Sequence, residues 1–331
     1  MSLRDRARGA LYGLAIGDAL GMPTQLLSRP QIVDRWGPVL TGFEAAPDDH
    51  PIAAGMPAGA VTDDTEQAVL LGRLLVEGGG RVDPGTLAAA LLGWEREMAA
   101  RGSLDLLGPS TKRALQAVQD GTPPAEAGRH GDTNGAAMRV TPVGIAAAAD
   151  NLPALVDHVQ QASLVTHNTS IALAGAAAVA AAVSAGIDGA SVPAATGMAI
   201  AAARLGGQRG HWTAGADVAA RIDWAAGLVA GAGPRQAAEL IYTLVGTSLA
   251  TNESVPAAFA VLSAIPDDPW RACLLAASLG GDCDTIAAMA GAVAGACHGL
   301  AGFPPAAVET VDRNGLDLAA LADSLLQLRK S

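Results

Sequence analysis

Apolar residues recur at three-to-four spacing along nearly the whole chain, which is the period of an amphipathic α-helix. The segments with this pattern are residues 4–20, 64–77, 84–100, 109–119, 152–164, 169–185, 192–204, 215–228, 234–245, 253–264, 269–278, 285–300, 304–314 and 318–329. Several begin with proline near the first turn, after glycine or aspartate, which is a common start signal of a helix. Alternating runs of β-branched residues are missing. The pattern predicts an all-α protein with more than ten helices.

The chain carries no obvious division into parts. No repeat of fixed period is evident, which argues against a solenoid, and no linker rich in proline, serine or charge interrupts the sequence. A chain of 331 residues is long enough for one large domain, so we expect residues 1–331 to form a single domain. The main predicted loop, residues 41–61, leaves two readings open, a lid or a solvated connector. Residues 121–135 and 206–215 are the other long predicted loops.

The composition indicates how the helices pack. Hydrophobic residues make up 50% of the chain and charged residues 16%, which is typical of a globular protein with a large core. Aromatic residues are only 3%, whereas glycine occurs 40 times. Small side chains let helices approach closely, so tight helix packing is predicted. The net charge of −11 and the pI near 4.9 argue against nucleic acid as a partner.

The cysteines and the N-terminus bear on location. Cys273, Cys283 and Cys297 are too few and too scattered for a disulfide framework, and they fit a reducing compartment. Residues 1–8 are charged, and no apolar segment with a cleavage site follows, which argues against a secretory signal. The most membrane-like run, residues 171–187, is short for a membrane span and almost all alanine, glycine and valine. We expect a cytoplasmic protein with no membrane partner.

Two short acidic clusters carry the main chemical signal. They are Thr62-Asp63-Asp64-Thr65 and Asp282-Cys283-Asp284-Thr285. Mg²⁺ and Mn²⁺ take oxygen ligands from carboxylates, hydroxyls, carbonyls and water, so two such clusters brought together would hold a pair of ions. Each cluster alone is also a plausible helix cap, because aspartate and threonine accept bonds from free backbone N–H groups. Adjacent carboxylates repel unless a cation or proton lies between them, which favours the metal site.

Five segments, in order along the chain, share one resemblance. They are residues 13–23 (GLAIGDALGMP), 62–65 (TDDT), 134–142 (NGAAMRVTP), 166–167 (TH) and 281–296 (GDCDTIAAMAGAVAGA). Together they resemble the ADP-ribosylglycohydrolase family over nearly the whole length. The resemblance implies an all-α fold around a binuclear Mg²⁺ or Mn²⁺ centre. The implied metal ligands are Thr62, Asp63, Asp64, Asp282, Asp284 and Thr285.

The resemblance also implies the chemistry. The two ions would hold the vicinal hydroxyls of a ribose and activate a water, which displaces the group on the anomeric carbon. A ribofuranosyl bond breaks through an oxocarbenium-like state, for which a positioned nucleophile and a lowered water pKa are suited. Asp63 or Asp64 would be the catalytic residue that orients or deprotonates this water, and either could instead be a ligand alone.

The residues implied to bind substrate lie in the third and fourth segments. They are Asn134, Gly135, Met138, Arg139 and His167. The Asn134–Gly135 loop would lie along the ribose and diphosphate, with backbone N–H groups toward anionic oxygens; without the resemblance, Asn-Gly predicts a plain turn. Arg139 would pair with a phosphate or form a buried structural ion pair. His167 would contact the distal ribose or lie near a helix cap.

Three positions depart from the family pattern. Gln25 stands where a glutamate is common, and Glu44 in the predicted loop is a possible replacement. Thr133 replaces the usual glycine before Asn134. Cys283 occupies a position that is usually small or hydroxylated, and we expect it to pack rather than ligate, since an oxygen-rich site does not favour thiolate.

The sequence and the resemblance leave three functions to compare. The first is metal-dependent hydrolysis of the glycosidic bond at the anomeric carbon of ADP-ribose attached to a protein side chain or small molecule, so the expected partner is an ADP-ribosylated protein or a small ribosyl substrate. The second keeps the metals but hydrolyses a nucleoside or another ribosyl N-glycoside. The third is a non-catalytic, crystallin-like relative, against which the four intact aspartates of the two clusters argue.

Overall fold

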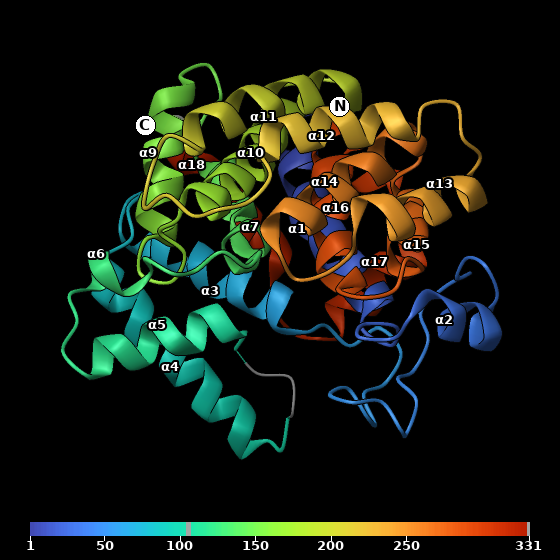
Figure 1. The fold of residues 1–331 in the computed structure, drawn as a ribbon, viewed down its shortest axis with the longest axis horizontal. Helices are drawn as coiled ribbons and strands as arrows, with labels where there is room; N and C mark the ends of the chain where they lie inside the picture. The colour runs from blue at the N-terminus through green and yellow to red at the C-terminus, as the bar shows by residue number, and fades with distance from the viewer. Residues whose placement is uncertain (104–106, 330–331) are drawn as a thin grey trace.

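The helices account for most of the molecule. The computed structural model describes residues 1–103 and 107–329. Its helices are α1 (Leu3–Gly21), α2 (Arg29–Trp36), α3 (Asp63–Glu77), α4 (Pro84–Ala100), α5 (Pro109–Gln119), α6 (Pro124–Ala127), α7 (Gly135–Arg139), α8 (Thr141–Ala146), α9 (Leu152–Ser163), α10 (Ser170–Ile187), α11 (Val192–Gly206), α12 (Val218–Leu228), α13 (Pro234–Leu240), the π-helical η1 (Ile241–Val245), α14 (Thr251–Ala264), α15 (Pro269–Ala277), α16 (Cys283–His298), the 3-10 turn η2 (Leu300–Gly302), α17 (Pro305–Asp312) and α18 (Leu318–Leu328). Apart from two isolated bridges, the described residues contain no β-pairing. The all-α prediction is confirmed (Figure 1).

Several short helices differ from the sequence-based expectation. α2, α7 and α8 were not predicted, and α6 lies inside the predicted loop 121–135. α2 has eight residues, and its start is held by Gln31, whose side chain accepts from the backbone and hydroxyl of Ser28. The predicted helix 234–245 divides into α13 and η1, and it ends at Gly246, where φ is +90°. Such features depend on local hydrogen bonds and turns rather than on a long apolar stripe.

α1 and α16 pack antiparallel at the centre of the molecule, with glycines of α1 directly against the backbone of α16. Glycine occupies every fourth position on the inner face of α1, from Gly9 to Gly21. A Cβ atom at Gly13 would lie 2.1 Å from the carbonyl oxygen of Gly291, and one at Gly21 would lie 2.2 Å from Cα of Asp284. Neither position has room for a side chain. This contact fixes the start of α16 against the end of α1.

α10 forms the second central helix and packs against α11, α16 and α8. Among the described residues it is the one helix long and apolar enough to cross a membrane, but 94% of that stretch is buried inside the protein. Its alanine-rich surface is therefore covered by neighbouring helices, as the sequence predicts for a core helix.

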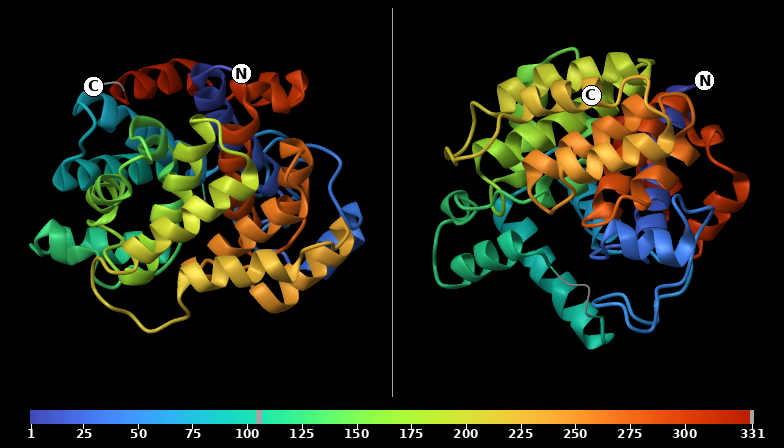
Figure 2. Two further views of the ribbon diagram at one scale, coloured as in Figure 1. Left: turned by 90° about the horizontal axis from the view of Figure 1, so that it is seen from above. Right: turned by 45° about the vertical axis from the view of Figure 1, so that its right-hand side comes forward.

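Two groups of elements flank the start of α3. α4, α5 and α6 lie on one side, whereas α2 and the extended segment 41–61 lie on the other, as Figure 1 and the left-hand view of Figure 2 show. The segment 41–61 contains turns and no helix, as predicted. The acidic start of α3 therefore faces the space between two projecting parts of the chain.

Candidate active site

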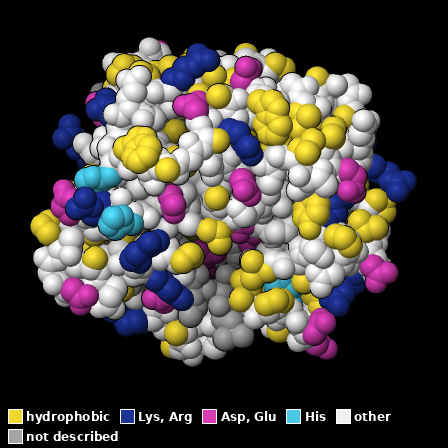
Figure 3. Space-filling model, viewed as in Figure 1, with side chains coloured by type: hydrophobic (Ala, Val, Ile, Leu, Met, Phe, Trp, Pro, Cys, Tyr) yellow, Lys and Arg dark blue, Asp and Glu magenta, His cyan; other side chains and the backbone are white. Residues whose placement is uncertain are grey.

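A cleft of about 190 Å³ opens where these groups meet. Figure 3 shows a hollow in this face, with acidic side chains at its bottom and hydrophobic ones on its rim. The lining residues are Gln25, Leu26, Ile52, Asp63, Gly108, Pro109, Thr111, Thr133, Asn134, Gly135, Met138, Leu249, Asp282, Asp284 and Thr285. Residues from three of the four segments that were predicted to form the site, the two acidic clusters and the Asn134 loop, thus border one cavity.

The first acidic cluster begins α3. Thr62 is the N-cap, and its hydroxyl accepts from the backbone N–H of Asp64. Asp63 faces the cleft, and its Oδ2 accepts a hydrogen bond of 2.8 Å from Gln67 Nε2, one turn later on the same helix. Asp64 is only 1% exposed and lies behind the wall. The two adjacent carboxylates therefore point in different directions, as successive helical residues must.

The second cluster begins α16. Gly280 and Gly281 have φ of +90° and +71°, a left-handed conformation that glycine adopts without strain. They turn the chain so that Asp282 and Asp284 reach the cleft. The hydroxyl of Thr285 donates to Oδ2 of Asp64 at 3.2 Å. This bond joins the two clusters directly, although they are far apart in the sequence.

Asp18, to which the sequence pattern alone gives no role, also belongs to this arrangement. Its carboxylate accepts from the backbone and hydroxyl of Thr62, at 2.9 and 2.8 Å, and from the backbone and hydroxyl of Thr65. It is fully buried on α1, and burial raises its pKa to about 6. Its position inside the resembling segment 13–23 was the available signal. Asp18 anchors the start of α3 to α1.

The ionised state of these clustered carboxylates is electrostatically unfavourable in the folded protein. Burial raises the pKa of Asp64 well above its usual value, and the nearby charges of Asp284, Asp63, Asp18 and Asp282 raise it further. Burial also raises the pKa of Asp282, although hydrogen bonds from Asn134 and Thr285 oppose this. Like charges in a low-dielectric site favour either a proton or a cation between them.

The donor set fits a hard divalent cation. The six predicted ligands offer only carboxylate and hydroxyl oxygen, which Mg²⁺ and Mn²⁺ prefer. Oδ1 of Asp64 is buried and has no hydrogen-bond partner among the described residues, so it is an acceptor that an ion would satisfy. Within the described chain, no three His, Cys, Asp or Glu side chains already converge as a ligand group. Threonine hydroxyls and water would have to complete the coordination.

The predicted substrate loop forms the opposite wall. The side-chain amide of Asn134 donates to Ser254 Oγ at 3.1 Å and to Oδ2 of Asp282. Gly135 and Met138, at the start and on the inner face of α7, also line the cleft. A Cβ at Gly135 would lie 2.7 Å from Cε1 of His167. These three predicted residues therefore lie beside the second acidic cluster.

Arg139 and His167 lie behind the wall instead. Arg139 is 1% exposed and donates to Oε1 of Gln67 and to Oγ1 of Thr166. His167 is fully buried and contacts Thr166 Oγ1 at 2.8 Å and Thr133 Oγ1 at 3.0 Å. Burial lowers the pKa of His167 well below its usual value, so the ring is neutral. Neither side chain lines the cleft.

The three departures from the family pattern have distinct environments. Gln25 lines the cleft and is 4% exposed, and Glu44 is not among the lining residues. The segment 41–61 reaches the cleft through Ile52, and His50 Nε2 lies 2.9 Å from the carbonyl oxygen of Gln25.

Cys283 is buried with its Sγ 3.2 Å from Thr24 Oγ1, and burial raises its pKa to about 12. A neutral, packed thiol is what the sequence predicts there.

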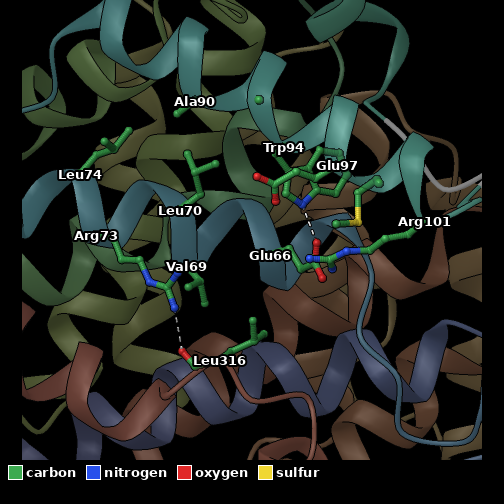
Figure 4. Close-up of a pocket in the computed structure, with 12 residues that line it drawn as sticks. Glu66, Val69, Leu70, Arg73, Leu74, Ala90, Trp94, Glu97, Arg101 and Leu316 are labelled. Atoms are coloured by element: carbon green, nitrogen blue, oxygen red, sulfur yellow. Dashed lines mark hydrogen bonds between the residues drawn. The ribbon is translucent and has the colours of Figure 1, made fainter.

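A larger cavity, of about 480 Å³, lies between α3 and α4 (Figure 4). Glu66, Arg73, Trp94, Glu97 and Arg101 are on its walls, and Trp94 Nε1 donates to Glu66. None of the predicted metal or substrate residues lines it. The clustered carboxylates border the smaller cleft instead, so size alone is no guide to the candidate site.

Comparison with known proteins agrees with the geometry. The ADP-ribosylglycohydrolase family profile matches residues 1–331. The chain is 39% identical to the protein YegU of Escherichia coli K12 over 98% of both chains. It is 31% identical to ADP-ribosylarginine hydrolase Tri1 of Pseudomonas putida, over 93% of this chain and 74% of that one. A solved structure described as an ADP-ribosylglycohydrolase-related protein complex superposes with a TM-score of 0.69 at 26% identity, over 99% of both chains. The chain therefore belongs to the ADP-ribosylglycohydrolase family and is a glycosidic-bond hydrolase.

Proposed function

We propose that the cleft hydrolyses the bond at the anomeric carbon of ADP-ribose attached to a protein side chain or a small molecule, with two Mg²⁺ or Mn²⁺ ions. The ligands would be Thr62, Asp63, Asp64, Asp282, Asp284 and Thr285. The observation that carries this proposal is the junction of two acidic helix starts at one cleft, closed by the bond from Thr285 to Asp64. The name of the Tri1 relative supports the substrate class.

The two aspartates of α3 take different roles in this proposal. When bound, the ions would hold the ribose hydroxyls and lower the pKa of a water. Asp63 faces the cleft, so it orients the water and accepts its proton as the oxygen attacks the anomeric carbon. The bond to the leaving atom breaks in the same step, and the leaving group carries away the bonding electrons. Asp64 is buried behind this position and serves as a ligand.

The Asn134 loop would face the rest of the substrate. The backbone N–H of Asn134 already donates to the carbonyl of Leu249 at 3.0 Å. Gly135 is the first residue of α7, and an N–H at this position has no partner inside its own helix. Donation to a diphosphate oxygen therefore falls to Gly135 rather than to Asn134. The side chain of Asn134 instead orients Asp282.

One observation favours the alternative substrate. No lysine or arginine is among the described residues that line the cleft, and Arg139 lies beneath its wall. A nucleoside or another ribosyl N-glycoside without a diphosphate would fit the same metal site. The two substrates differ in whether the diphosphate adds binding energy.

A panel assay tests both. The wild-type protein would be incubated with ADP-ribosyl-arginine, ADP-ribosyl-serine and free nucleosides, with Mg²⁺, Mn²⁺ or a chelator. We expect metal-dependent release of ADP-ribose from at least one ADP-ribosyl substrate. Calorimetry on the metal-loaded protein should then show tighter binding of ADP-ribose than of adenosine. Equal binding of the two, with nucleoside cleavage, would replace this proposal by the nucleoside alternative.

A further inference from the structure

A chain of buried hydrogen bonds runs beneath the cleft and joins its two walls. It passes from Asp63 through Gln67, Arg139, Thr166 and His167 to Thr133. Every intermediate member is at most 1% exposed. We propose that Arg139 is a positioning residue, which from beneath the cleft fixes Asp63 on one wall and the Thr133–Gly135 loop on the other. The inference rests on the proposed function, since it concerns the same cleft.

The branch toward Asp63 has one possible direction. Arginine only donates hydrogen bonds, and an ionised carboxylate only accepts them. Because Arg139 Nη1 donates to Oε1 of Gln67 at 3.2 Å, the amide group of Gln67 is left to donate to Asp63 Oδ2, at 2.8 Å. Gln67 thus links the buried guanidinium of Arg139 to Asp63, and its amide group becomes a fixed donor to one oxygen of that carboxylate.

The branch toward the loop runs through the ring of His167. Thr166 Oγ1 accepts from Arg139 Nη2 and lies 2.8 Å from Nδ1 of His167, and its own proton can go to that nitrogen or to the carbonyl of Ser163, 3.4 Å away. With its proton on either nitrogen, the neutral ring bridges Thr166 and Thr133 Oγ1, which lies 3.0 Å from Nε2. Burial and the nearby charge of Arg139 keep the ring neutral by lowering its pKa. Thr133 stands where the family resemblance leads one to expect glycine, so this last link depends on a residue that departs from the family pattern.

The position of Arg139 is costly for a purely structural residue. Burial lowers its pKa to about 10, and its Nε has no hydrogen-bond partner in the described structure. A buried charge is tolerated when paired and hydrogen-bonded. Asp63 is the acidic group whose charge acts on it, through one intervening glutamine. The guanidinium therefore also offsets part of the negative charge of the cluster.

Two substitutions remove the two branches of this hydrogen-bond chain separately. Gln67→Met removes the donor to Asp63, and Thr166→Val removes the link to His167. Mn²⁺ affinity and ADP-ribose affinity would be measured by calorimetry, together with kcat and KM. Because bonds to ligating carboxylates orient them, we expect Gln67→Met to weaken Mn²⁺ binding roughly tenfold or more and to lower kcat with little change in KM. Thr166→Val should leave Mn²⁺ affinity within about twofold and raise KM and the Kd of ADP-ribose.

Matched variants separate positioning from stability. Arg329 is a mostly buried arginine far from the cleft that donates to backbone carbonyls, so Arg329→Met should lower the melting temperature without changing Mn²⁺ affinity. Arg139→Lys keeps the charge but cannot bridge Gln67 and Thr166, so it should impair both metal and ADP-ribose binding. Wild-type Mn²⁺ affinity in Gln67→Met overturns the inference. So does an equal loss of both affinities in Gln67→Met and Thr166→Val, in proportion to their melting temperatures.

The proposed function is judged by a different result in the same experiment. A wild-type protein that binds Mn²⁺ but not ADP-ribose overturns the proposed substrate, and the Gln67 branch is then decided by Mn²⁺ affinity alone. A wild-type protein that binds no divalent ion overturns both.

Discussion

At the residue scale, Asp63 and Asp284 are expected to be essential for hydrolysis. Each lies on the cleft and is an anionic ligand in the proposed centre, and asparagine replaces that charge at nearly the same size. Asp63→Asn and Asp284→Asn should each lower kcat/KM at least 100-fold, equivalent to about 2.7 kcal/mol. Circular dichroism should stay helical. Asp150→Asn, at an exposed turn, is the control. Wild-type activity in both cluster variants would remove the metal-site proposal.

The sequence predicts the acidic residues at this scale but not their neighbours. Two helices start at the same place, which brings together Thr62, Asp63, Asp282, Asp284 and Thr285. Their carboxylate and hydroxyl groups are what predicts a metal site from the sequence. The role of Asp18 depends on α1 lying against α3, which no local pattern encodes. Arg139 lies within a few residues of Asn134, yet burial turns it away from the cleft. Such orientation follows from tertiary packing.

At the scale of elements, the α1–α16 contact should tolerate no side chain on its glycine face. Gly21→Ala would place Cβ 2.2 Å from Cα of Asp284. Because the obstacle is backbone, α16 must move, and we expect a loss of about 3 kcal/mol in the free energy of unfolding or more. Gly197→Ala is the matched control, since nothing lies within 4 Å there; it should stabilise by about 0.5–1 kcal/mol. Urea unfolding measures both, and equal effects would refute the contact.

The ion pairs between α1 and α18 make a pH-dependent contribution. Arg4 and Arg8 both donate to Asp323 and hold its pKa below the usual range. Because the unfolded value is about 3.9, this stabilisation is present above about pH 4 and is lost as pH falls toward the folded value. Asp323→Asn should therefore lower the free energy of unfolding at pH 7, and its difference from wild type should shrink at pH 3. A difference that stays constant between the two pH values would contradict the pairing.

The long helices are predictable from sequence for a simple physical reason. An apolar stripe repeated over three or more turns has one favourable arrangement, so segments such as α3, α4 and α10 appear with nearly the expected bounds. α2, α7 and α8 have eight residues or fewer and lack such a stripe. α2 is held at its start by its own capping bonds between Ser28 and Gln31, whereas the entry to α7 is held by the distant carbonyl of Leu249. The substrate wall is therefore the least predictable part of the fold.

At the scale of the whole molecule, divalent ions should stabilise the fold. The clustered carboxylates repel one another, and their pKa values are raised in the folded state. A ligand that binds only the native site stabilises it by mass action, by about 2.7 kcal/mol at a concentration 100 times its Kd. We expect Mn²⁺ or Mg²⁺ to raise the melting temperature by roughly 5 °C and a chelator to reverse this. Asp284→Asn should abolish most of the shift, whereas Asp150→Asn should keep it. If Mn²⁺, Mg²⁺ and chelator all leave the melting temperature unchanged, these carboxylates hold protons rather than metal.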